Sequence, residues 1–138
     1  MLACGAMLPR LASADAVRAQ VAVRVVYQFD LGLDQALRGL RSIGNHLAAD
    51  PKARITVVAL GAGVDFLLQD AQTPGGYPFA LMVSELQDRG VRFAACRNTL
   101  ESRRLDARDM IEGIDIVPSG VAEIARLQIE EQHAYIKP

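Results

Sequence analysis

The residue with the clearest capacity for chemistry is Cys96, which directly follows the run Val91–Ala95. That run is typical of a buried strand, so we expect Cys96 at the carboxyl end of a strand. Ligands and reactive groups in open α/β sheets gather beyond these strand ends. Asn98–Glu101 matches a helix capping pattern, which predicts a helical turn capped by Asn98 just beyond the cysteine. The positive end of such a helix favours a thiolate over a thiol.

Local positive charge supports the same chemistry. Five arginines stand against Glu101 and Asp106 across residues 92–108. We expect Arg97 and Arg103 to stabilise an anionic sulfur species, and Asn98 to shape its pocket. A second interpretation stays open, in which Cys96 is a small buried hydrophobic residue and the arginines form an ordinary solvated helix face.

Other chemical sites are disfavoured. Gly61–Gly63 follows a predicted strand but lacks the third glycine of a dinucleotide fingerprint, so a tight turn is the better interpretation. His46 and His133 have no cysteine or carboxylate at metal-ligand spacing, which favours structural roles. We therefore predict no metal and no organic cofactor.

Composition and charge restrict the function further. The chain has 138 residues, of which 51% are hydrophobic and 22% charged, enough for one packed domain. The net charge of −1 gives no global reason to expect binding to nucleic acid or to an anionic membrane. No apolar run approaches the roughly 20 residues of a transmembrane helix, so we expect a soluble protein.

Short β-branched runs alternate with helical patterns from residue 21 onward, which predicts an α/β fold with a mostly parallel sheet of about five strands. Asp30 is the expected cap of the first helix, and Pro118–Gly120 the expected start of the last. The predicted strands cover residues 21–29, 55–60, 91–95, 114–117 and 134–136, and the predicted helical segments 33–47, 64–69, 79–89 and 121–131.

The first 20 residues differ from the rest and are interpreted as an N-terminal arm or the remnant of an export signal, with the domain covering residues 21–138. Ala12–Ala14 resembles a signal cleavage region, but Pro9 and Arg10 interrupt the apolar run before it. Cys4 lies in this arm, so no disulfide framework is expected. A reactive thiol favours the cytoplasm, and a periplasmic location would follow if the arm is a signal remnant.

Four parts of the sequence stand out in combination: Leu33–Arg38, Gly90–Leu100 with Leu105 and Asp106 after it, Val117–Glu123, and Ala134–Pro138. Together they resemble the DsrE/DsrF-like family of small sulfur-relay proteins. The resemblance extends from about Val23 to Pro138.

This resemblance implies a three-layer flavodoxin-like fold, assembly into homotrimers or homohexamers, and a cysteine that carries sulfane sulfur as a persulfide. Cys96 matches the family's sulfur-carrying position. The implied function is that of a sulfur carrier or sulfurtransferase, with donor and acceptor proteins as partners. The alternative is a non-catalytic oligomeric binding module in which Cys96 is structural.

Overall fold

The chain folds around a five-stranded, wholly parallel sheet with the strand order β4-β3-β2-β1-β5. The computed structural model describes residues 9–11, 13–16 and 21–138. Most of the predicted N-terminal arm, including Cys4, lies outside these residues. The strands are β1 (Arg24–Phe29), β2 (Arg54–Ala59), β3 (Arg92–Cys96), β4 (Asp115–Val117) and β5 (Ala134–Ile136).

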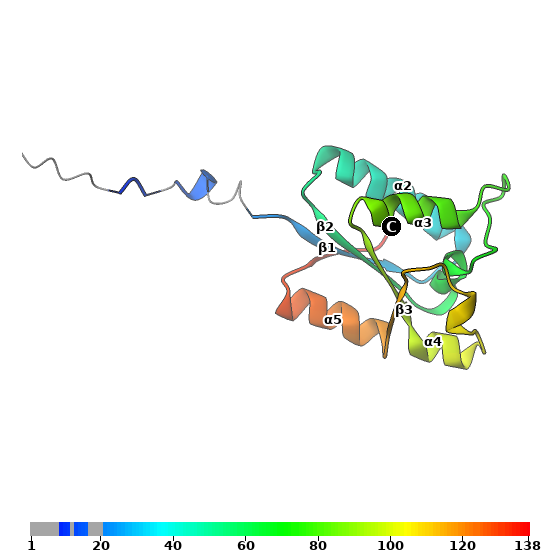
Figure 1. Ribbon diagram of the computed structural model, residues 1–138. Coiled ribbons are helices and arrows are strands. Elements are labelled where there is room, and N and C mark those ends of the chain that lie inside the picture. The colour runs from blue at the N-terminus through cyan, green and yellow to red at the C-terminus, as the bar shows by residue number, and fades with distance from the viewer. Residues whose placement is uncertain (1–8, 12, 17–20) are drawn as a thin grey trace, which may run out of the picture.

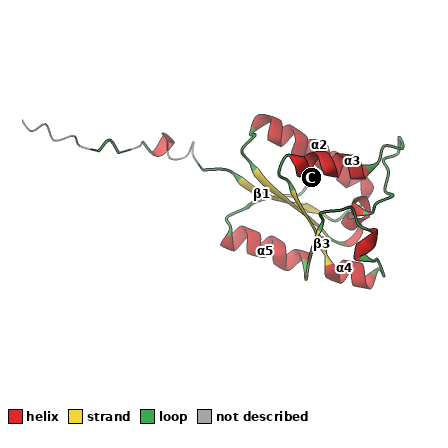
Figure 2. Ribbon diagram, in the orientation of Figure 1, coloured by secondary structure: helices red, strands yellow, loops and turns green. Residues whose placement is uncertain are grey.

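Helices cover both faces of the sheet, as Figures 1 and 2 show. Helices α2 (Leu33–Ala49) and α3 (Phe79–Asp88) lie on one face, and α4 (Arg97–Ser102) and α5 (Gly120–Glu130) lie on the other. Two short 3-10 helices, η1 (Gly61–Leu67) and η2 (Ala107–Asp109), occur in the connections. The predicted three-layer α/β fold is therefore confirmed.

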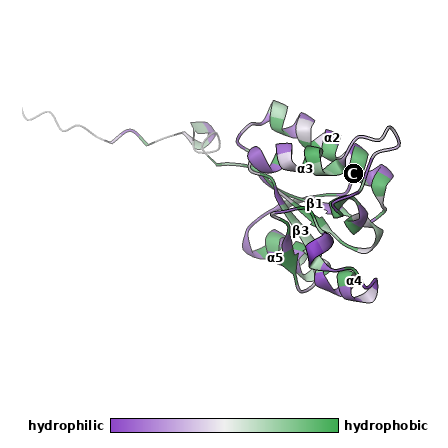
Figure 3. Ribbon diagram, turned by 45° about the vertical axis from the view of Figure 1, so that its right-hand side comes forward, coloured by the Kyte–Doolittle hydropathy of each residue, from purple (hydrophilic) through white to green (hydrophobic). Residues whose placement is uncertain are grey.

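The two faces of the sheet bury unequal amounts of apolar side chain. Alternate strand residues point to opposite faces, so Val25 and Phe29 join the larger core beneath α2 and α3, where Phe66, Phe79 and Phe93 also lie. In Figure 3 the colouring of α2 alternates between hydrophobic and hydrophilic, as expected for a helix with one buried side. The core beneath α5 is smaller and consists of Val26, Val58, Ala94, Val117, Ile124 and Leu127.

Element boundaries differ from the sequence prediction at a few points. The first strand begins at Arg24 rather than at residue 21, and the segment expected over 64–69 is η1. The prediction that Asp30 caps the first helix is wrong, because the cap of α2 is Gly32. The Asp30 carboxylate instead binds Lys137 at 2.7 Å and accepts a hydrogen bond from Gln28. In the described part of the chain, no helix combines the length and apolar character needed to cross a membrane.

The backbone around Gly63 leaves no room for a side chain. A Cβ at this position would lie 1.9 Å from the carbonyl oxygen of Phe29, whereas a Cβ at Gly44, within α2, would meet nothing within 4 Å. We expect Gly63→Ala to lower the free energy of unfolding by about 2–4 kcal/mol. The control Gly44→Ala should raise it by about 0.5–1 kcal/mol, because alanine favours a helix. Urea unfolding measures both, and equal effects would contradict this account of Gly63.

Glu123 anchors α5 to the sheet. Its carboxylate binds Arg126 within the helix and Arg92 on β3, each at 2.9 Å. Hydrogen bonds from Arg126, joined by those from Arg92 and opposed by burial, lower the pKa of Glu123 to about 2.

A lowered carboxyl pKa stabilises the fold above the pKa of the unfolded chain, and this stabilisation is lost as the pH falls through the folded value. Glu123→Gln should therefore cost about 1–2 kcal/mol at pH 7 and progressively less towards pH 2. Urea unfolding across this range checks the trend. A cost that did not depend on pH would show that the ion pairs contribute nothing.

Candidate active site around Cys96

Cys96 is the last residue of β3 and the N-cap residue of α4. It pairs in register with Val117 at the end of β4 and is only 6% exposed. It forms no disulfide and is the free cysteine of the described chain. The predicted position at the carboxyl end of a buried strand is thus found in the structure.

A second helix begins against the same cysteine. Helix α5 starts at Gly120, and the side chain of its N-cap Ser119 accepts a hydrogen bond from the Ala122 N–H. A Cβ on Gly120 would lie 3.2 Å from the Cβ atoms of both Cys96 and Leu60. Because Gly120 has no side chain, the first turn of α5 can pack directly on Cys96.

The amide groups of these two helix starts act on the sulfur. Burial raises the pKa of the Cys96 thiol, but the N–H groups of Gly120 and Thr99 stabilise the thiolate. The Thr99 hydroxyl and the Asn98 N–H act in the same direction, and the net effect is a pKa below that of an ordinary cysteine.

Thr99 connects the sulfur to the loop after β2. Its hydroxyl oxygen accepts a hydrogen bond of 2.9 Å from the N–H of Gly61, and the residue is buried. A hydroxyl has one proton to donate, and the bond from Gly61 leaves that proton free to face the sulfur. Sequence analysis missed both Thr99 and Gly120, although a glycine directly after the capping serine was a signal for close helix packing.

The arginines and the asparagine expected at the site occupy different positions around it. Arg103 binds the Asp65 carboxylate at 2.7 Å and donates to the Gly61 carbonyl at 3.1 Å, so it holds η1 against the end of α4. Arg97 and Asn98 are exposed on the first turn of α4. The prediction that Asn98 caps this helix is wrong. Strand β3 continues directly into α4 without a loop, so Cys96 itself is the N-cap residue.

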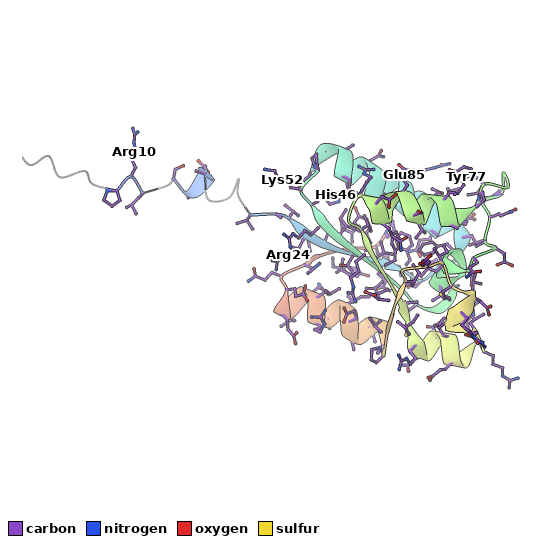
Figure 4. All side chains as sticks on the ribbon, in the orientation of Figure 1. Arg10, Arg24, His46, Lys52, Tyr77 and Glu85 are labelled. Carbon is purple, nitrogen blue, oxygen red and sulfur yellow. The ribbon has the colours of Figure 1, made fainter. Side chains whose placement is uncertain are left out.

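The two histidines occupy structural positions away from Cys96. The Tyr27 hydroxyl lies 2.9 Å from Nδ1 of His46, at the inner side of α2, while His133 contacts the Leu127 carbonyl through its own Nδ1 at 3.1 Å. Figure 4 shows His46 between α2 and the sheet. Over residues 9–11, 13–16 and 21–138, no cluster of three or more histidine, cysteine or acidic side chains could hold a metal ion.

The fold and this site define a class of small α/β proteins with a cysteine at the end of a central parallel strand. A family model places the chain more closely: residues 32–138 match the DsrE/DsrF-like family, and the chain belongs to it. No curated protein matches the chain.

Two solved structures share the fold. The protein of unknown function MTH1491 from Methanobacterium thermoautotrophicum is 39% identical with a TM-score of 0.75, and the match covers 84% of this chain and 99% of that one. The YchN protein of E. coli is 15% identical with a TM-score of 0.70, and the match covers 86% of this chain and 100% of that one. The first similarity extends to sequence, and the second concerns the fold.

The position of the Thr99 hydroxyl predicts its effect on thiol reactivity. Thr99→Val keeps the side-chain shape but removes the hydroxyl, so the pKa of Cys96 should rise and alkylation by iodoacetamide at neutral pH should slow by about 3–10-fold. Thr99→Ser should restore most of the rate. The rate profile against pH measures the effect, and an unchanged profile in Thr99→Val would show that the hydroxyl does not act on the sulfur.

Proposed function

We propose that the protein is a sulfur carrier of the sulfurtransferase type, which accepts sulfane sulfur on Cys96 as a persulfide and passes it on. The observation that carries this proposal is the position of a free cysteine at the point where β3 meets two helix starts, whose N–H groups favour a lower pKa of the thiol. Membership of the DsrE/DsrF-like family supports a function of this kind.

The chemistry is a pair of thiol exchanges without net oxidation. The Cys96 thiolate attacks the outer sulfur of a donor persulfide, the S–S bond of the donor breaks, and the donor leaves as a thiolate. Cys96 then carries the transferred sulfur as a persulfide anion. In the second exchange an acceptor thiolate attacks that outer sulfur, and Cys96 leaves as a thiolate again.

Both exchanges benefit from the groups around Cys96. The amide N–H groups stabilise the attacking thiolate and stabilise it again when it becomes the leaving group. Arg97 and Asn98 are exposed beside the cysteine, where they would contact the incoming donor or acceptor. Arg103 would contribute through the loop that it holds, since its guanidinium already binds Asp65.

This function requires partners and a suitable compartment. A carrier needs a protein or small-molecule persulfide as donor and a thiol protein as acceptor. We further propose that the protein acts as a homotrimer or homohexamer, as the family resemblance implies. Persistent free thiols suit the reducing cytoplasm, which is the location that we favour.

Incubation with polysulfide followed by mass spectrometry tests the proposal. The intact protein should gain about 32 Da, the mass of one sulfur atom, and reduction should remove it. Cys96→Ser should abolish the adduct, while the matched control Cys4→Ser should retain it. An inert Cys96, or an adduct that depends on Cys4, would favour the alternative of a binding module with a structural Cys96.

A further inference from the structure

A cavity of about 610 Å³ lies at the amino ends of β1, β2 and β3, at the opposite end of the sheet from Cys96. Arg24, Arg54, Thr56 and Arg92 all line it. They share one sheet face, because Arg24 pairs with Arg54 and Thr56 pairs with Arg92 in register. This is the face that carries the smaller core beneath α5.

The cavity exists because α5 covers only part of this face. The helix ends at Glu130, and the chain returns through His133 to the edge strand β5. Figure 4 shows Arg24 at the amino end of β1, beside the C-terminal end of α5, and Figure 1 shows β3 meeting α4 at the other end of the sheet. The arginines of the cavity therefore lie far from the thiol.

The arginines that line the cavity outnumber the carboxylates that bind them. Arg92 is held by Asp115 at 2.6 Å and Glu123 at 2.9 Å. Arg24 donates only to a main-chain carbonyl, that of Glu131, at 3.2 Å.

Arg54 and Arg89 also line the cavity, and neither side chain forms an ion pair or hydrogen bond with any described residue. The carboxylate of Glu131, which is the acidic residue of the lining, is bound to Arg126 at 2.7 Å. Three guanidinium groups, those of Arg24, Arg54 and Arg89, are thus left without a carboxylate partner among the described residues.

Two buried polar side chains also face this space. His133 is 8% exposed, and its Nδ1 must carry the proton that is donated to the Leu127 carbonyl, since a carbonyl oxygen can only accept. Its Nε2 has no partner in the described structure, and the residue lines the cavity. Thr56 is 6% exposed, and its hydroxyl likewise has no partner among the described residues. Neither of these two atoms is fully enclosed by protein, so both open onto the cavity and are available for hydrogen bonds to a bound molecule.

We propose that this cavity binds a small phosphorylated molecule through Arg24, Arg54 and Arg89, with the Thr56 hydroxyl as a further donor and His133 Nε2 as an acceptor for the organic group. Guanidinium groups bind phosphate oxygens in bidentate geometry, and three of them suit a ligand with at least two negative charges. The volume lies within the range of small-molecule sites, which leaves space for an organic group beside the phosphates. This site is independent of the sulfur chemistry, so either proposal can fail without the other.

Calorimetric titration of the full chain tests the site with two probes, inorganic pyrophosphate and ADP, and with adenosine as the uncharged control. We expect both anions to bind and adenosine not to bind. Tighter binding of ADP would identify an organic phosphate as the ligand, and equal binding would identify a free polyphosphate. If neither anion bound at millimolar concentration, the proposal would be wrong.

Matched variants separate a built site from general charge attraction. Arg54→Gln combined with Arg89→Gln should weaken pyrophosphate binding at least tenfold. Arg38→Gln combined with Arg41→Gln removes the same charge from the exposed side of α2 and should change binding less than twofold. Equal losses in the two variants would overturn the proposal, and the unfolding midpoint of each confirms that it is folded.

Amide chemical-shift mapping with pyrophosphate gives an independent result. Shifts should cluster at Thr56, Gly90 and His133, all of which line the cavity. Shifts that instead cluster at Thr99 and Gly120 would assign the anion to the cysteine end of the sheet and would also overturn the proposal.

Discussion

The parallel pairing of β3 with β4 is the constraint on which the cysteine site depends. Cys96 and Val117 are partners in this pairing, and α5 begins at Gly120, shortly after Val117 in the chain. The register therefore fixes the start of α5 next to Cys96, while the chain after β3 starts α4 from the same residue. Because β2 also holds β3 in register, a shift of one residue in this pairing would turn Val117 to the other face of the sheet and displace the start of α5 from Cys96.

The thiolate is stabilised by short-range dipoles rather than by the nearby arginines. Amide N–H groups that are fixed by helix starts need no reorganisation when the sulfur becomes charged, and burial strengthens their effect because water is excluded. A flexible arginine on an exposed helix face would lose conformational entropy if it were to stabilise the thiolate. The ion pair of Arg103 with Asp65 fits this arrangement, since it orders the backbone that binds Thr99.

The two ends of the sheet have different polar character for a topological reason. At the carboxyl ends, helices begin and present amide donors, whereas at the amino ends, helices have ended and long side chains line a cavity. Two solved structures share this architecture, and one of them is 39% identical to this chain in sequence. A shared fold does not define a reaction, so function rests on the particular groups at each end.

The sequence by itself determined the succession of strands and helices along the chain and the position of Cys96 at a strand end. Hydrophobic periodicity and turn residues are local signals, so both could be predicted. It also indicated the start of α5 correctly, since Pro118–Gly120 is a local capping pattern. It misplaced the caps at Asp30 and Asn98, because a capping side chain competes with tertiary partners and with the direct continuation of a strand into a helix.

Only the tertiary structure decided which distant groups meet. Thr99 and Gly120 act on the sulfur, and Gly61 binds the Thr99 hydroxyl, because three parallel strands end at the same edge of the sheet. Local sequence patterns do not predict these contacts between distant segments. The same holds for the arginines of the cavity. Strand register brings Arg24 beside Arg54, and the turn between α3 and β3 places Arg89 at the same cavity. Whether a segment forms a helix or a strand depends mainly on residues that are close in the chain. The sites at the two ends of the sheet depend instead on how distant strands pair.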